Sequence, residues 1–153
     1  MAVDGVETDV RALVEDEQAS WGELQSLLGS LSPDQAERPG YFAEGWSAKD
    51  LLAHIAGWLA EAGLVLEQIR MGTFTGKDMD IEGMNALFLE ANRSEPMRVV
   101  HAEAFAARTR LLGEVGQLVS VTSEAEVWLR KAGPQHYAEH LPRLREWITE
   151  QGS

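Results

Sequence analysis

The stretch "SAKDLLAHIAGWLAEAGLVLEQIRMG", Ser47–Gly72, decides the fold class of this 153-residue chain. Ser47, followed three residues later by Asp50, resembles the capping box that opens many helices, although Glu or Gln is commoner at the second position. Apolar residues then recur at the three-and-four spacing of one buried helix face: Leu51, Leu52, Ile55, Trp58, Leu59, Ala62, Leu66 and Ile69. Gly72 is a typical helix terminator. Together these signals predict one long amphipathic helix.

The same helical spacing continues on both sides of this segment. We expect a first helix from a Thr8 or Asp9 cap to about Leu31, and a last helix from Pro134 to about Glu150. The remaining predicted helices are a short piece at Asn85–Asn92, a longer one with Ser94 as cap and Pro96 in its first turn that ends near Val119, and one from Thr122 or Ser123 to Lys131.

Two stretches, residues 32–45 and 72–83, interrupt the helical periodicity, and no stretch predicts a β-sheet. Residues 32–45, "SPDQAERPGYFAEG", are expected to form a loop because they hold two prolines and two glycines. No segment shows a sustained alternation of apolar and polar residues. We therefore predict an all-α fold of one domain, residues 1–153, a four-helix bundle with short extra helical segments in its connections.

Composition excludes several classes of function. The chain has no cysteine, so a disulfide, a thiolate metal ligand and a cysteine nucleophile are all excluded. Its net charge of −12 argues against binding to nucleic acid or to an anionic membrane surface. No apolar run approaches the about 18 residues that span a bilayer. The first ten residues lack the basic and apolar regions of a signal peptide, so we expect a cytoplasmic location.

Three of the four histidines are placed where they can converge. His136 and His140 are one turn apart on the last predicted helix, so their rings can reach one point. We expect His140 in the buried row and His136 at its flank. His54 shares the inward face of the second helix with Trp58. Three imidazoles hold a divalent metal and leave a coordination position open, and Asp50, Glu61 and Glu139 are candidates to orient the rings. The competing interpretation is a surface histidine beside a buried one, with His54 only hydrogen-bonded.

Two further residues bear on this interpretation. His101 is interpreted as structural or pocket-lining and not as a ligand. Pro142 follows His140 by two residues, removes one helical hydrogen bond and crowds the carbonyl of Ala138. The helix is expected to bend or restart there, either for packing alone or to aim the two histidines at a cavity.

Two motifs resemble those of the DinB-like superfamily. "EGWSAKDLLAHIAGWLAEA", residues 44–62, contains the pattern W-S-x-x-D-x-x-x-H, and "HYAEHLPRLREW", residues 136–147, contains H-x-x-x-H. The chain also resembles maleylpyruvate isomerase N-terminal domains. Trp58 and residues 71–88, "MGTFTGKDMDIEGMNALF", are similar to ClbS/DfsB-like proteins.

This resemblance implies a fold, a metal and a chemistry. The fold is a four-helix bundle of up-down-down-up topology, commonly a homodimer. The metal is zinc or nickel, bound by the equivalents of His54, His136 and His140. Many relatives use a low-molecular-weight thiol. Ten arginines against three lysines, with abundant alanine, suggest a GC-rich bacterial origin, for which that thiol is mycothiol.

Three functions remain open from the sequence. The first is a metal-dependent enzyme, a thiol-dependent transferase or isomerase or a hydrolase, acting on a small molecule with Glu61 as base. The second is a protein that sequesters a small molecule without turnover. In either, Trp46, Trp58, Tyr137 and Phe42 are candidates to line an apolar substrate pocket, although packing in the core and loops is the favoured explanation for these aromatic residues. The third is an interaction module in which the metal only joins helices.

Overall fold

The computed structural model describes residues 10–41, 45–76 and 78–152. These residues form helices and connections and contain no strand, so the predicted all-α class is confirmed. The helices are α1 (Val10–Gly29), α2 (Pro33–Ala36), α3 (Ala48–Met71), α4 (Ile81–Asn92), α5 (Met97–Gln117), α6 (Ser123–Ala132) and α7 (Pro134–Gln151). None of these helices is long and apolar enough to cross a membrane.

The ends of α3 follow the sequence closely. The backbone N–H of Ser47 donates to Asp50 Oδ2 at 2.9 Å, and the Asp50 N–H donates to the Ser47 hydroxyl at 3.2 Å. The predicted capping box is therefore confirmed. At the other end Gly72 has φ = 75°, the left-handed conformation that glycine adopts without a steric penalty.

Other helix boundaries differ from the prediction. Part of the expected loop is the short helix α2, because Ser32 and Gln35 cap each other in a second capping box. Helix α4 begins at Ile81, where the Asp80 side chain accepts the N–H of Gly83. The residue that caps α5 is Pro96 and not Ser94.

Two predicted caps remain to be placed. Thr122 caps α6 as predicted, with its side chain accepting the N–H of Ala125. Thr8 and Asp9 lie outside the described residues.

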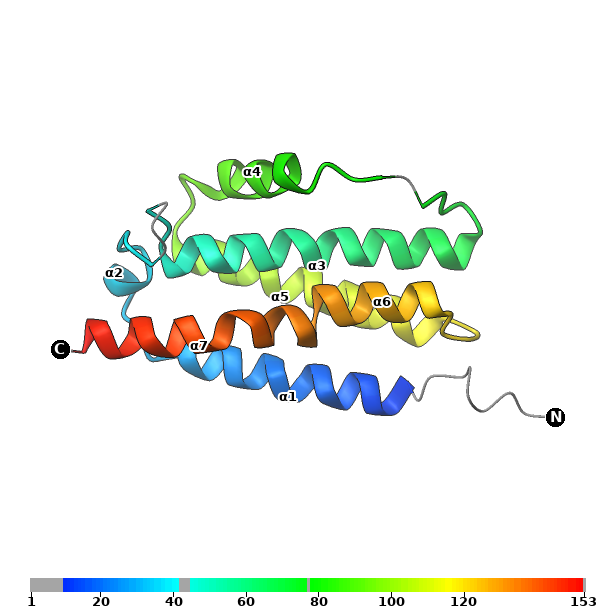
Figure 1. Ribbon diagram of the computed structural model, residues 1–153, viewed down its shortest axis with the longest axis horizontal. Coiled ribbons are helices and arrows are strands. Elements are labelled where there is room, and N and C mark those ends of the chain that lie inside the picture. The colour runs from blue at the N-terminus through cyan, green and yellow to red at the C-terminus, as the bar shows by residue number, and fades with distance from the viewer. Residues whose placement is uncertain (1–9, 42–44, 77, 153) are drawn as a thin grey trace.

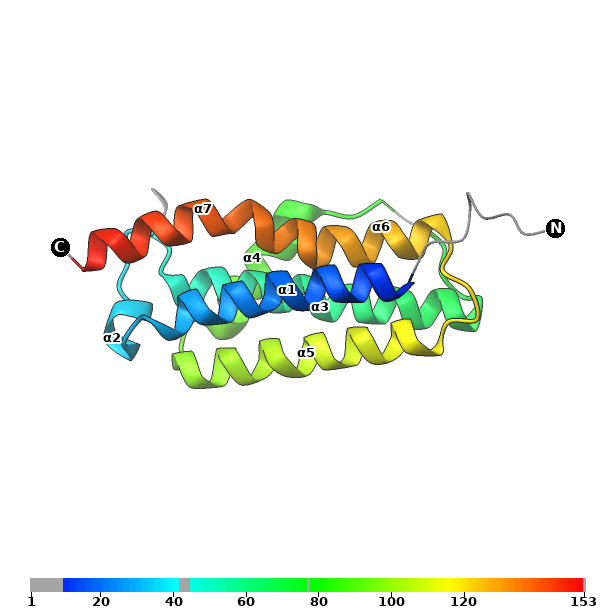
Figure 2. The ribbon, with the colours of Figure 1, turned by 90° about the horizontal axis from the view of Figure 1, so that it is seen from below.

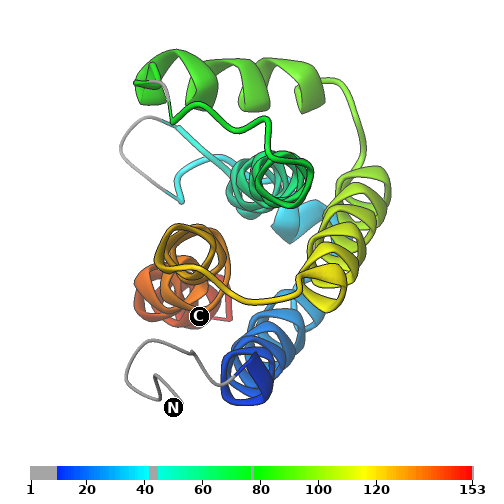
Figure 3. The same cartoon turned by 90° about the vertical axis from the view of Figure 1, so that its right-hand side faces the viewer.

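The long helices lie side by side around a common interior (Figures 1 and 3). Helix α3 packs against α5, α6 and α4, while α7 packs against α1 and α6. In Figure 2 the colour gradient shows that α3 and α5 run in one direction, whereas α1 and the α6–α7 pair run in the other. Helix α4 lies outside this group, against the face of α3 turned away from α7 (Figure 1).

A buried ion pair links three of these helices. The carboxylate of Glu17 on α1 is fully buried and accepts two bonds from Arg108 on α5, each 2.7 Å long. It also accepts the hydroxyl of Tyr137 on α7 at 3.0 Å. The arginine lies over the Trp21 ring at 5.1 Å. Because an unpaired buried charge is costly, this network fixes how α7 sits against α1 and α5, and α7 carries two of the candidate metal ligands.

Candidate metal centre

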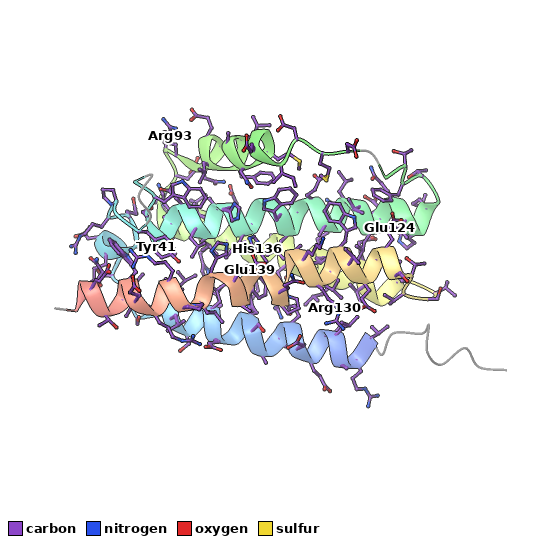
Figure 4. The ribbon with its side chains drawn as sticks, viewed as in Figure 1. Tyr41, Arg93, Glu124, Arg130, His136 and Glu139 are labelled. Carbon is purple, nitrogen blue, oxygen red and sulfur yellow. The ribbon has the colours of Figure 1, made fainter. Side chains whose placement is uncertain are left out.

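Histidines from two helices converge between α3 and α7. His54 comes from α3, and His136 and His140 come from α7; Figure 4 shows His136 between these two helices. The Nε2 atoms of His54 and His136 are 3.0 Å apart. One ring nitrogen from each of the three histidines lies within 4.8 Å of the other two. The convergence expected from the sequence is therefore present in the fold.

The order of burial is the reverse of the prediction. His136 is 8% exposed, whereas His140 is only half-buried. The reason is the junction between α6 and α7, where Ala132, Gly133 and Pro134 are all buried and the start of α7 is covered. His140 lies one turn further along and is partly exposed.

Helix α7 is not interrupted where the sequence suggested. It runs from Pro134 to Gln151 with Pro142 in its interior, and the break in the helical path falls at Gly133, between α6 and α7. Tyr41 makes two hydrogen bonds to α7 near Pro142. Its hydroxyl donates to the His140 carbonyl at 3.5 Å, and its carbonyl accepts the Nε–H of Arg143 at 2.7 Å. The helix does not restart at Pro142, and the junction at Gly133 lies just before the pair of histidines.

Burial keeps all three rings neutral at neutral pH. Loss of hydration lowers the pKa of His54 to about 4, with the nearby His140 adding to the effect. Burial, together with His54 and His140, lowers the pKa of His136 to about 3, and the Ala132 carbonyl opposes this weakly. Burial also lowers the pKa of His140, against an opposing effect of Glu139. Neutral imidazoles have the free lone pairs that metal binding requires.

The facing ring nitrogens of His54 and His136 fit a metal ion. The Nε2 atoms of His54 and His136 face each other at 3.0 Å. If one of the two Nε2 atoms carries a proton, it donates to the lone pair of the other. A metal cation instead binds the lone pairs of both Nε2 atoms. Zinc–nitrogen bonds of about 2.0–2.1 Å place two ligand nitrogens at a separation similar to the observed one. Imidazole donors suit both zinc and nickel.

The three acidic residues proposed to orient the histidine rings occupy different surroundings. Asp50 is engaged in the capping box of α3. Glu61 is half-buried on α3 and does not line the cavity beside the histidines, so its predicted role as the base has no geometric support. Glu139 does line that cavity, and Figure 4 shows it at the start of α7 near His136.

This cavity has a volume of about 540 Å³ and lies against His54 and His136. Trp58, a predicted pocket residue, forms part of its wall. Trp46 does not; its ring packs on His54 with 5.5 Å between centroids and faces a separate, more polar hollow at the start of α3.

Tyr137 was predicted to contact substrate, but it does not line this cavity. It is fully buried and is hydrogen-bonded to Glu17, because it faces α1 while its neighbour His136 faces α3. Phe42 lies outside the described residues.

Several residues of the cavity wall were not predicted from the sequence. Trp128 and Lys131 come from α6, Gln135 from α7 and Asn85 from α4. A helix was predicted over most of α6, but nothing in the chain indicated which of its residues would face His136. His101, in contrast, lies elsewhere as expected, with its Nε2 2.5 Å from Gln25 Oε1 on α1.

Comparison with known proteins places the chain in a family. Residues 18–148 match the model of the mycothiol maleylpyruvate isomerase N-terminal domain. The chain belongs to that family. All three converging histidines of this mycothiol maleylpyruvate isomerase N-terminal domain protein lie within the matched residues, and the resemblance to the DinB-like superfamily is confirmed.

A solved structure supports the same fold. The crystal structure of an uncharacterised protein from Escherichia coli UTI89 is similar, with a TM-score of 0.77, 17% sequence identity and coverage of 97% of each chain. At this level of identity the likeness concerns the fold alone. No curated protein matches the sequence.

Proposed function

We propose that this protein is a divalent-metal-dependent enzyme that carries out thiol-dependent S-transfer or isomerisation on a small molecule. The proposal rests on one observation, the convergence of His54, His136 and His140 beside a cavity. Zinc or nickel is the proposed ion. When bound, such an ion lowers the pKa of a coordinated water or thiol and so supplies a nucleophile at neutral pH.

The residues around the proposed ion have distinct roles. The three histidines are held neutral by burial and so remain available as ligands at neutral pH. Glu139 lines the cavity, and we propose its carboxylate as the proton acceptor in place of Glu61.

The reacting thiol comes from a cosubstrate in this proposal. The chain contains no cysteine, and the family to which it belongs is named for mycothiol. We therefore propose mycothiol, or a thiol of the same kind, as cosubstrate, and the cytoplasm as the location where such thiols are kept reduced. Product formation from mycothiol and a panel of electrophiles, followed by mass spectrometry, tests this assignment.

Metal analysis of the purified protein tests the site itself. We expect about one equivalent of zinc or nickel in the wild type and a large loss in His54→Ala. The matched control is His101→Ala, which removes a histidine outside the converging group and is expected to retain the metal. Equal metal content in the wild type and in His54→Ala would refute the metal site.

A sequestering function is the second candidate, because Trp58 and Trp128 give the cavity walls suited to holding an apolar ligand. In that case the ligand quenches tryptophan fluorescence and is recovered unchanged by mass spectrometry. Recovery of a thiol adduct or an isomer favours the enzyme.

The arrangement of the long helices supports a finer description of the fold. We interpret α1, α3, α5 and the α6–α7 pair as a four-helix bundle of up-down-down-up topology. A homodimer is proposed for the assembled protein, and sedimentation equilibrium measures it directly.

A further inference from the structure

The indole of Trp58 is held in the cavity wall by a residue of another helix. Its Nε1 donates to Asn85 Oδ1 on α4 at 2.7 Å. Its ring meets the Phe88 ring edge-on, with 5.4 Å between centroids and 83° between planes. Because the only donor of the indole is engaged, the part of Trp58 left for a ligand is its carbon surface.

A glycine in α3 allows α4 to approach this closely. A Cβ added at Gly57, next to Trp58, would collide with the ring of Phe88. Helix α4 thus rests in a notch of α3 at the position where Asn85 reaches the indole. The ammonium of Lys49 on α3 secures the chain after α4 by donating to the carbonyls of Arg93 at 3.2 Å and Glu95 at 2.8 Å.

The opposite part of the cavity is also aromatic and apolar. Trp128 and Val127 come from α6. Ile81 is the first residue of α4, and Met79 lies two residues before it. The volume of about 540 Å³ falls within the roughly 300–1,000 Å³ of small-molecule sites. Tryptophan rings favour flat partners, because stacked and edge-to-face aromatic pairs gain stabilisation beyond the area that they bury.

We propose that this cavity binds a molecule with a flat aromatic body against Trp58, and that Asn85 is the positioning residue that sets the indole for it. Placement of a reactive group of that molecule toward the histidines rests on the proposed function. The aromatic contact itself needs no metal, so the two proposals are tested separately.

Two probes with the same carbon skeleton test the preference for a flat ligand. We titrate the protein with 2-naphthol and with its saturated analogue decahydro-2-naphthol, and follow the indole N–H resonances by NMR. Trp58→Phe identifies the Trp58 resonance. We expect 2-naphthol to shift this resonance and to bind about three- to tenfold more tightly than the saturated analogue.

Variants of Asn85 test its positioning role. Asn85→Leu removes the acceptor, so it should move the Trp58 N–H resonance in the free protein and weaken 2-naphthol binding about three- to tenfold. Asn85→Asp keeps an acceptor oxygen in the same place and should restore both. A residue that only supports α4 as a structural element would not produce this selective rescue.

Gly57→Ala tests the close packing of α4 on α3 without changing either partner of the hydrogen bond between Trp58 and Asn85. Alanine is a better helix former than glycine, so α3 itself is not weakened, but Phe88 must move and the affinity for 2-naphthol should fall. Gly113→Ala on α5 is the matched control, since its added Cβ meets nothing within 4 Å. Thermal melts verify that each variant is folded.

Equal affinity for the two probes would overturn the aromatic preference, and unchanged binding in Asn85→Leu would overturn the positioning role. Metal content, measured on the same samples, keeps the proposals apart. A metal-free protein that binds 2-naphthol as described supports this inference and refutes the metal site. A metal-loaded protein that does not bind 2-naphthol supports the metal site and refutes this inference.

Discussion

At the scale of single residues, Tyr137 illustrates how two neighbours on one helix acquire different roles. His136 faces α3 and the cavity, while the Tyr137 hydroxyl donates to the buried carboxylate of Glu17. Tyr137→Phe removes that bond, and we expect a loss of about 1–2 kcal/mol in the free energy of unfolding, measured by urea titration. Ligand affinity should stay unchanged, because the side chain does not line the cavity. The reverse pattern, full stability with lost affinity, would restore its role as a substrate contact.

The histidines also make a prediction about pH. Burial lowers the pKa of His54 to about 4 and that of His136 to about 3, whereas both have pKa values near 6.5 when unfolded. Between these values the unfolded chain binds more protons than the folded chain, so stability of the metal-free protein falls as pH decreases below about 6.5. Urea midpoints at pH 7.5 and 5.0 measure this loss. The double variant His54→Gln, His136→Gln should lose less over the same interval; an equal loss contradicts the assignment.

At the scale of elements, the caps of α3 and α5 show one prediction that the structure confirms and one that it does not. Ser47 caps α3 through its hydroxyl, whereas Ser94, which was expected to cap α5, precedes a helix capped by Pro96. Ser47→Ala is therefore expected to cost about 1 kcal/mol of stability. Ser94→Ala should change it by less than about 0.5 kcal/mol. Thermal or urea unfolding of the pair checks both, and equal effects would show that α3 and α5 begin otherwise than described.

At the scale of the whole molecule, the proposed ion joins helices that are far apart in sequence. His54 lies on α3 and His136 on α7, so a ligand bound by both stabilises the folded state and not the unfolded chain. At a free ion concentration of 100 times Kd, this amounts to about 2.7 kcal/mol. For a chain of this size, chelation should then lower Tm by about 5–10 °C. The His54→Ala variant should melt at the same temperature with and without chelator.

The sequence by itself determined the helical class, the capped and terminated ends of α3 and the pairing of His136 with His140, because caps and one-turn spacings are local properties of the chain. Tertiary structure decided which of those two histidines is the more buried, that Tyr137 anchors α7 to α1, and that Asn85, Trp128 and Lys131 join the cavity. Each of these depends on how a helix is rotated about its axis when it packs. That rotation is set by contacts between distant segments, such as Glu17 with Arg108 and Gly57 with Phe88, and no local pattern encodes it.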